Sequence, residues 1–386
     1  MKFVGYKDEE LKSFLSGSRF TVTYRITGSE KDVLGKAHSL CIEQTVEFPA
    51  DQIECNIIRS DIIGRIADLR PAGDNSYRAV ISYADEDAGL EFPQFLNVVF
   101  GNSSILPDIV VERVDLSEAQ KKIFTGPRYG VWGLRERLNV HGRPFTFTAL
   151  KPMGLSAESL AAEAYQCASG GIDLIKDDHG ILNQAFSPFS ERVKLVSSAV
   201  QKANAETGGH TAYIPNLSGG FRDMADRIKL CEEYGVGGVM FAPGLVGFDM
   251  LYYCSQHTAL PVVGHPAFLG SYTDRGRGGF ECGCIFGQLP RLAGADIMVF
   301  PNFGGRFSLS EEQCAGIRRM ALEDLGPIQR MIPCPAGGMK VEKVGMMRKF
   351  YSDDVALLIG GSLFTSSPDL SANCRAFKEK LESRRK

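Results

Sequence analysis

The chain has 386 residues, 44% of them hydrophobic and 23% charged, which is typical of a folded α/β protein and argues against disorder. The formal net charge of -3 and an isoelectric point near 6.1 do not favour nucleic acid or an anionic membrane as a partner. No apolar run reaches the ~18 to 20 residues of a membrane span, and no secretory segment is visible, so we expect a cytoplasmic protein with reduced cysteines.

The first 125 residues predict a small mixed α+β domain. Alternation of apolar and polar residues is typical of half-buried antiparallel strands, and apolar residues three or four apart are typical of helices. The strand pattern covers 20–27 and 77–83, the helical pattern covers 31–41, and 94–100 fits either element. A glycine-proline pair at 126 and 127 then marks a boundary, so we expect domains at 1–125 and 126–386.

From residue 126 onward, short apolar runs alternate with helical stretches, which predicts repeated βα units and a parallel sheet. The runs are 145–150, 172–175, 212–217, 238–241, 261–264, 297–300, 331–335 and 355–359. Eight strands over about 240 residues are the size of a (β/α)8 TIM barrel. A doubly wound open sheet is the alternative, but no Gly-x-Gly-x-x-Gly follows a first strand.

Polar residues follow the ends of several runs. The first, second and fifth runs are followed by Lys151, by Lys176-Asp177-Asp178-His179 and by His265. Charged groups at the end of a buried strand are costly unless they bind each other or a metal ion. Barrel enzymes build their active sites at these carboxyl ends, so we expect the site here. The alternatives are a solvated turn with a surface ion pair and, for the histidine, a core residue.

Two glycine pairs follow the last two runs. Gly337-Gly338 comes after the seventh run and Gly360-Gly361 after the eighth. Backbone N–H groups that no side chain covers can converge on phosphate oxygens, and barrels commonly bind phosphate after strands seven and eight. One such pair is common in turns, whereas two at these places predict a phosphate site.

Two segments together resemble the signature of the RuBisCO superfamily. They are Ala149-Leu150-Lys151-Pro152-Met153-Gly154-Leu155-Ser156 and Gly170-Gly171-Ile172-Asp173-Leu174-Ile175-Lys176-Asp177-Asp178. The resemblance covers nearly the whole barrel, and more loosely the first 125 residues. It implies a C-terminal (β/α)8 barrel preceded by a smaller α+β domain of ferredoxin-like type.

The resemblance also implies a metal site. Lys176 would react with CO2 to become N6-carboxylysine, and this carbamate would bind one Mg2+ together with Asp178 and His179. Carboxylating members have a glutamate at the place of His179, and imidazole suits softer divalent ions better than Mg2+. Another divalent ion is therefore an alternative, as is Asp177 or water in the third position.

Further roles carry over from the family. Lys151 corresponds to its proton-transfer lysine and His265 to the strand-five histidine that contacts substrate or relays protons. Asn102 and Glu43 would reach the substrate from a neighbouring subunit, which implies a homodimer or larger homo-oligomer with shared active sites. Arg306 aligns near the lysine of the family's mobile loop.

Departures from the carboxylases point to a different substrate. Met153, Pro266, Val299 and Ala336 stand where those enzymes have polar groups, and the groups at the places of Pro266 and Val299 bind a second phosphate. A buried phosphate needs polar partners, so a bisphosphate is not expected. The chain resembles the RuBisCO-like proteins, which enolise without carboxylation. The altered positions, together with Phe303, suit an apolar tail.

We therefore expect an isomerase, acting by metal-dependent enolisation on 5-methylthioribulose 1-phosphate in methionine salvage or on a similar sugar monophosphate. One alternative is a decarboxylase of a phosphorylated β-keto sugar acid, as in apionate breakdown. A second is the diketo-methylthiopentyl phosphate enolase, although Asn102 replaces the lysine of that branch. A third is a non-catalytic binding relative, which would not need both Lys151 and Lys176.

Overall fold

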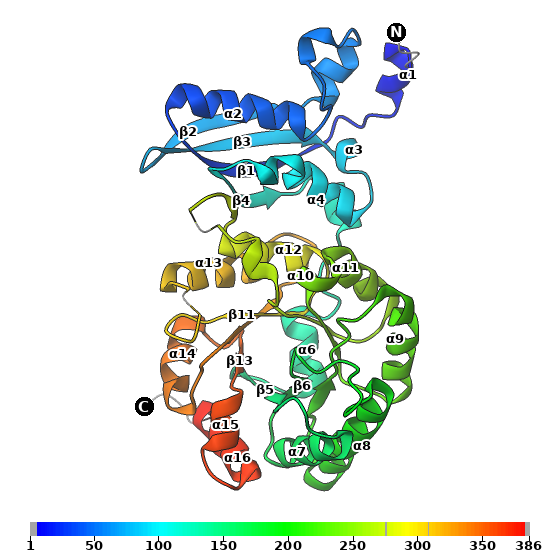
Figure 1. Cartoon of the computed structure of the whole chain (residues 1–386), viewed down its shortest axis with the longest axis vertical. Coiled ribbons are helices and arrows are strands. Elements are labelled where there is room, and N and C mark those ends of the chain that lie inside the picture. Colours follow the sequence, from blue (N-terminus) through cyan, green and yellow to red (C-terminus); the bar gives the residue numbers. More distant parts are fainter. Residues whose placement is uncertain (1–5, 275, 308, 383–386) are drawn as a thin grey trace. The chain divides into compact units, whose positions relative to one another are not determined.

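The computed structural model describes residues 6–274, 276–307 and 309–382, and the chain divides into two compact units (Figure 1). The first unit contains Met1–Thr125 and Ser271–Gln288, and the second contains Gly126–Gly270 and Leu289–Lys386. The segment 271–288, which the sequence places inside the barrel, thus groups with the first unit. Within the described ranges, no helix is both long and apolar enough to cross a membrane.

The first unit is built on a five-stranded sheet with the order β10-β4-β1-β3-β2. Strands β1 to β4 pair antiparallel, with helices between β1 and β2 and between β3 and β4, as in a ferredoxin-like fold, and β10 adds in parallel to β4. The alternating pattern of β1 buries one of its faces. The elements are α1 Asp8–Ser13, β1 Arg19–Thr27, α2 Glu30–Glu43, β2 Arg65–Gly73, β3 Ser76–Ala84, α3 Asp85–Ala88, α4 Phe92–Phe100, β4 Ile109–Asp115, α5 Gln120–Ile123 and β10 Gly279–Phe280.

The second unit is a barrel of eight parallel strands with helices around it (Figure 1), which confirms the predicted fold class. Its two sheets, β13-β5-β6-β7 and β12-β11-β9-β8, are joined by a bridge between Asn216 and Met240 and by the contact of β12 with β13. The strands are β5 Phe145–Leu150, β6 Leu174–Asp177, β7 Ala212–Ile214, β8 Val239–Phe241, β9 Val262–Gly264, β11 Ile297–Pro301, β12 Ile332–Ala336 and β13 Ala356–Leu358. Each predicted run contains or overlaps one of them.

Local signals place the helices of the second unit. Before α7, for example, the Ser156 side chain accepts a hydrogen bond from the backbone N–H of Ser159, and Gly171 follows the helix with a φ of 80° that glycine tolerates. The helices are α6 Gly130–Leu138, α7 Ala157–Ser169, α8 Phe189–Thr207, α9 Met224–Glu233, α10 Pro243–Val246, α11 Phe248–His257, α12 Leu289–Leu292, α13 Glu311–Leu322, α14 Val344–Tyr351, α15 Gly361–Thr365 and α16 Leu370–Glu382.

A buried ion pair fixes the amino ends of β5 and β6. The Arg143 Nη1 atom lies 2.7 Å from Asp173 Oδ2, and the same carboxylate accepts hydrogen bonds from the backbone and hydroxyl of Thr146. These contacts hold the two strands in a register that pairs Leu150 with Asp177. The residues that follow both strands therefore emerge next to each other.

Candidate active site

Lys151 and Asp178 form an ion pair at the carboxyl ends of β5 and β6. The Lys151 Nζ atom lies 2.7 Å from Asp178 Oδ1, and both side chains are partly buried. Burial favours the protonated acid, but hydrogen bonds from His179 and Lys151 and the charge of Lys176 outweigh it and hold the pKa of Asp178 well below its ordinary range. Asp178 is thus a carboxylate at physiological pH and can serve as a ligand for a cation.

Lys176 is only 2% exposed although it carries an amine. Its Nζ atom donates a hydrogen bond to the backbone oxygen of Asp177 at 3.0 Å. Burial lowers the pKa of Lys176 to about 8, and the positive charge of Lys151 adds to this effect, while Asp178 opposes it. On the order of a tenth of this amine is therefore uncharged at pH 7. Only the uncharged amine can add to CO2.

Asp177 faces the wall of the barrel and is fully hydrogen-bonded. Its carboxylate accepts from Tyr213 at 2.8 Å, from the backbone of Asn216 at 3.0 Å and from Arg192 at 3.1 Å. Asp177 and Arg192 are both 0% exposed. Since successive residues of a strand point to opposite sides, this orientation separates Asp177 from Lys176 and Asp178. It leaves His179 or water, rather than Asp177, as the third ligand of a cation.

Two histidine rings stack beside the carboxylate. His179 and His265 have ring centroids 4.6 Å apart with an angle of 13° between the planes, and His179 Nδ1 lies 3.4 Å from Asp178 Oδ1. Burial, followed by the charges of Lys176 and His179, lowers the pKa of His265 well below its ordinary value. Because the neutral ring accepts a hydrogen bond from the backbone of Ala267 at Nδ1, its proton is on Nε2. His265 can therefore donate a hydrogen bond while uncharged.

The second glycine pair lies next to Lys151 and is joined to the turn that carries the first pair. A Cβ atom on Gly360 would lie 3.3 Å from Lys151 Cε, which places the turn after β13 beside the amine. The Ser362 hydroxyl donates to the backbone oxygen of Met339 at 2.8 Å, so the turns after β12 and β13 are joined. Gly337 and Gly338 have φ values of 89° and 95°. Both adopt a left-handed backbone that glycine accommodates without strain.

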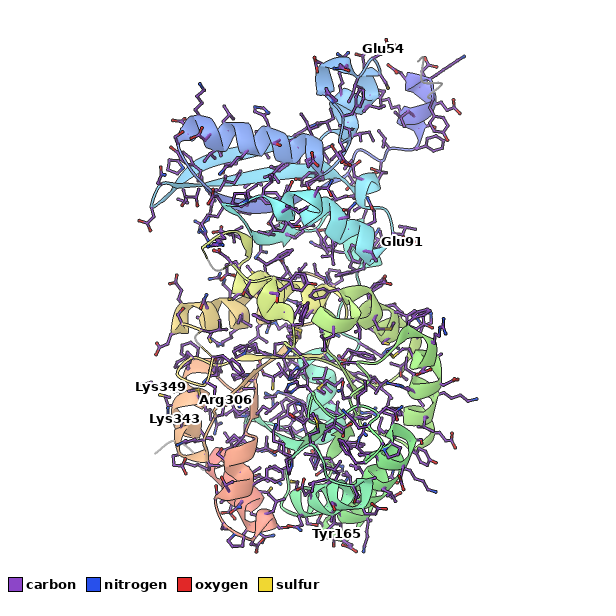
Figure 2. All side chains as sticks on the ribbon, viewed as in Figure 1. Glu54, Glu91, Tyr165, Arg306, Lys343 and Lys349 are labelled. Atoms are coloured by element: carbon purple, nitrogen blue, oxygen red, sulfur yellow. The ribbon has the colours of Figure 1, made fainter. Side chains whose placement is uncertain are left out.

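Arg306 belongs to the loop after β11 and contacts the first glycine turn. Its backbone N–H donates to the oxygen of Gly337 at 2.9 Å, and a Cβ atom on Gly338 would lie 3.5 Å from Arg306 Cγ. The side chain is exposed, and Figure 2 marks its place in the second unit. The guanidinium lies 5.3 Å from the ring centroid of Phe307. The loop thus carries a positive charge next to one glycine turn.

Glu43 and Asn102 lie together in the first unit. The Asn102 side-chain amide donates to Glu43 at 3.1 Å and to Glu47 at 3.2 Å. Asn102 is exposed and Glu43 half-buried. The structure therefore brings these two predicted site residues into one polar cluster. Glu47 belongs to the same cluster but is not one of the predicted site residues.

Two residues near the site are not among the predicted site residues. Glu163 of α7 accepts from the backbone N–H of Lys151 at 3.4 Å, and burial raises the pKa of Glu163 to about 7. The Asn216 side chain donates to the backbone oxygens of His179 and Ile181 at 3.0 Å each, which holds the loop after β6. Glu163 is one polar residue of an ordinary amphipathic helix. Asn216 stands at a strand end, and that position was its only signal.

Within the described ranges, no three His, Cys, Asp or Glu side chains are placed to hold a metal ion. Asp178 and His179 supply two donors, and a carbamate on Lys176 would supply oxygen as the third. A hard cation prefers such oxygen ligands. The donor set therefore fits a divalent ion on the condition that Lys176 is carboxylated, and its lowered pKa favours that reaction.

Comparison with known protein families matches residues 130–384 to the family described as the ribulose bisphosphate carboxylase large chain, catalytic domain. The chain belongs to the RuBisCO family. Ribulose bisphosphate carboxylase-like protein 1 of Rhodopseudomonas palustris is 37% identical over 366 residues, which cover 95% of this chain and 98% of that protein. The predicted resemblance to the non-carboxylating RuBisCO-like proteins is thereby confirmed.

Other RuBisCO-like relatives carry enzyme names. The 5-methylthioribulose-1-phosphate isomerase of Rhodospirillum rubrum is 34% identical over 360 residues, 93% of this chain and 95% of that enzyme. The 2,3-diketo-5-methylthiopentyl-1-phosphate enolase of Geobacillus thermodenitrificans is 28% identical over 371 residues, 92% and 90% of the two chains. Among solved structures, a Rubisco-like protein from Rhodopseudomonas palustris matches with a TM-score of 0.87 and 38% identity, covering 96% of this chain and 99% of that one.

Proposed function

We propose that this RuBisCO-like protein enolises a phosphorylated ketose without fixing CO2 and thereby isomerises 5-methylthioribulose 1-phosphate or a similar sugar monophosphate. The observation that carries the proposal is the 2.7 Å contact between Lys151 and Asp178 next to the buried amine of Lys176. Enolisation needs a base at an acidic C–H group and a positive charge at the developing enediolate oxygen. This cluster offers a base and a cation site side by side.

The cofactor we propose is one Mg2+ per site, or another divalent ion, bound by carboxylated Lys176, by Asp178 and by His179. Such an ion, when bound, acts as a Lewis acid toward the carbonyl oxygen of a ketose. With Asp178 engaged as a ligand, Lys151 would lose its ion-pair partner, and its uncharged amine would accept the α-proton. His265, neutral with its proton on Nε2, would donate to a substrate oxygen or relay a proton to the neighbouring carbon.

We assign a single phosphate to the glycine turns. The backbone N–H groups of Gly337, Gly338, Gly360 and Gly361 would bind it, and Arg306 would add a positive charge from the adjacent loop. Glu43 and Asn102 would complete the substrate site from the partner subunit of a homodimer or larger assembly. A separated subunit would then be inactive although its own barrel is folded.

Two of the apolar residues expected around the substrate tail have packing partners within the protein. Val299 is buried in the core of the barrel, and Phe303 packs on Phe350 of α14 with ring centroids 4.7 Å apart. Met153, which is 52% exposed, and Pro266 next to His265 are still available. The preference for a methylthio tail therefore rests on these two residues and on the isomerase from Rhodospirillum rubrum among the relatives.

The enolase of methionine salvage is the second candidate, because several relatives bear that name. The decarboxylase remains an outcome of the assay. A second positive charge near the substrate would favour it, but Arg128 precedes α6 and bonds to the backbone of Ser255 in α11, so Arg306 is the cation left for this role.

The test is proton NMR in D2O with Mg2+ and bicarbonate. The protein is offered 5-methylthioribulose 1-phosphate, the 2,3-diketo-5-methylthiopentyl phosphate and a phosphorylated β-keto sugar acid in separate tubes. Deuterium entering beside the carbonyl of the first, with a new pentulose phosphate, would support the isomerase. Tautomerisation of the diketo compound would indicate the enolase instead, and CO2 release from the β-keto sugar acid would indicate the decarboxylase.

The variants Lys151→Met and Lys194→Met form a matched pair for this test. Both remove an amine, but Lys194 is exposed on α8. Activity that survives in Lys194→Met and disappears in Lys151→Met would support the assigned base. No reaction with any of the three compounds, in a protein that binds Mg2+ and CO2, would reject the proposed enolisation.

A further inference from the structure

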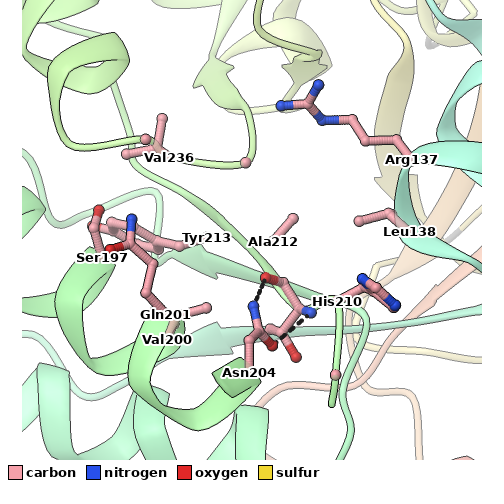
Figure 3. A pocket seen from close by; sticks show the side chains of 14 residues that line it. Arg137, Leu138, Ser197, Val200, Gln201, Asn204, His210, Ala212, Tyr213 and Val236 are labelled. Carbon is pink, nitrogen blue, oxygen red and sulfur yellow. Dashed lines mark hydrogen bonds between the residues drawn. The ribbon is translucent and has the colours of Figure 1, made fainter.

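A concave site lies at the other end of the barrel from the candidate active site. A hollow of about 270 Å³ opens at the amino ends of β7 and β8, between α6 and α8 (Figure 3). Its lining comes from Arg137 and Leu138 of α6, from Ser197 and Val200 of α8, and from the segments that lead into the two strands. We call it the amino-end hollow. The residues of the candidate active site follow the opposite ends of the strands, so the hollow is separate from that site.

The charge of the lining has one sign. The described residues of the hollow include Arg137 and His210 but no aspartate or glutamate. Both side chains are exposed at the rim, where the Arg137 guanidinium lies 5.5 Å from the ring centroid of Tyr129. In the described part of the chain, neither side chain has a carboxylate partner. An anionic group is the ligand chemistry that this rim favours.

The floor of the hollow contains an unpaired polar atom. Ser197 is 3% exposed, and its hydroxyl has no hydrogen-bond partner among the described residues. Buried hydroxyl groups are nearly always paired, so an unpaired one beside a cavity can pair with a ligand atom once its side chain rotates toward the cavity. The neighbouring amides do not fill it, because Asn204 bonds to the backbone of Thr211 and Gln201 donates to the backbone of Tyr234.

Apolar side chains also line the hollow. Leu138, Val200 and Val236 are all buried and line the hollow. Figure 3 shows Arg137 and His210 at one side of this space and Ser197 at the other. The lining therefore has a cationic side and a hydroxylic side, with apolar side chains beside both (Figure 3).

We propose that the amino-end hollow binds a small organic anion with a carboxylate or monophosphate head, a short apolar chain and a hydroxyl or carbonyl oxygen at its far end. The head lies between Arg137 and His210, the chain contacts the three aliphatic residues, and the far oxygen pairs with Ser197. The ligand is an effector or a stored metabolite rather than the substrate. Binding here does not depend on the proposed enolisation, and its test measures no turnover.

The experiment is an NMR titration of protein with 13C-labelled histidine, in which His210 is assigned with the variant His210→Gln. The probes are 5-hydroxypentanoate and 4-hydroxybutyl phosphate, which differ in the head group. Pentanoate lacks the far hydroxyl, and pentane-1,5-diol lacks the anion. We expect saturable shifts of the His210 signal with one or both hydroxylated anions, at least about tenfold tighter than with the diol.

Two variants assign the two ends of the ligand. Arg137→Gln should remove the preference for the anion over the diol, whereas Arg319→Gln, an exposed arginine on α13, should leave it unchanged. Ser197→Ala should make 5-hydroxypentanoate bind no better than pentanoate without loss of folding, because the deleted hydroxyl has no partner. The absence of any His210 shift at 10 mM probe (roughly the upper limit of a specific weak site) would overturn the proposal. Equal affinities of the wild type, Arg137→Gln and Ser197→Ala for the hydroxylated anions would also overturn it.

Discussion

Replacing Lys176 with methionine should make the protein more stable at pH 7. The lysine amine is buried at 2% exposure, and burial lowers its pKa from an ordinary value of 10.5 to about 8. That difference corresponds to about 3 kcal/mol by which the charged lysine destabilises the folded state at pH 7. The variant also loses the 3.0 Å hydrogen bond to the backbone of Asp177, which contributes about 1 kcal/mol. We expect a net gain of about 2 kcal/mol.

The gain should depend on pH in a defined direction. Because the folded protein releases the Lys176 proton more easily than the unfolded chain, the unfolded state binds more protons between pH 8 and 10.5. The whole destabilisation caused by charged Lys176 is therefore present below pH 8, and it is lost as the pH rises toward 10.5. The destabilisation by Lys176 falls from about 3 kcal/mol at pH 7 to about 1 kcal/mol at pH 9.5. The advantage of Lys176→Met should shrink by the same amount, about 2 kcal/mol.

The assay is urea unfolding followed by circular dichroism, in CO2-free buffer with a chelator, at half-unit steps from pH 7 to 9.5. Lys194→Met, an exposed replacement on α8, serves as the control and should differ from the wild type by less than about 0.5 kcal/mol at every pH. A Lys176→Met protein that is less stable than the wild type at pH 7, or whose difference does not change with pH, would refute the reasoning.

Three further predictions concern residues at the carboxyl ends of β5 and β6. Lys151→Met should slow deuterium exchange into the substrate by about 10² to 10⁴-fold in the NMR assay, and an unchanged rate would remove Lys151 as the base. Asp177→Asn should lower the free energy of unfolding in urea by about 3 to 5 kcal/mol, because it leaves the buried Arg192 without its carboxylate; a loss below about 1 kcal/mol would contradict the pairing. His179→Glu should tighten Mg2+ binding about tenfold in calorimetry with bicarbonate, and weaker binding would exclude residue 179 as a ligand.

The strands of the barrel could be predicted because they are buried on both faces and form short runs rich in apolar residues, such as Phe145–Leu150. The strand Arg65–Gly73 was not predicted. It is the edge strand of the first sheet, and none of its residues is buried, so it lacks the alternation that identifies a half-buried strand. An edge strand is specified by the neighbour that it pairs with, and a local pattern does not contain that neighbour.

The candidate site was predictable to a similar extent. The sequence shows which polar residues follow each strand, and for parallel strands this is enough to bring Lys151, Asp178 and His265 to one end of the barrel. It does not show that the Asp177 carboxylate accepts hydrogen bonds from Arg192 and Tyr213, which lie 15 and 36 residues further along the chain. Nor does it show Glu163 behind Lys151, because that contact depends on how α7 packs.

Because residues 271–288 belong to the first unit, the two units depend on each other during synthesis of the chain. Gly279 and Phe280 pair with Val110 and Val111 of β4, and the Gln288 side chain bonds to both backbone groups of Val114. On the ribosome, this sheet therefore stays incomplete until the first five barrel strands have been synthesised. The first unit can therefore be completed only after Gln288 has been made, and the barrel only after β11, β12 and β13 have followed. A gene fragment cut at residue 125 would lose a strand, so we expect the two units to be inherited together rather than exchanged as separate modules.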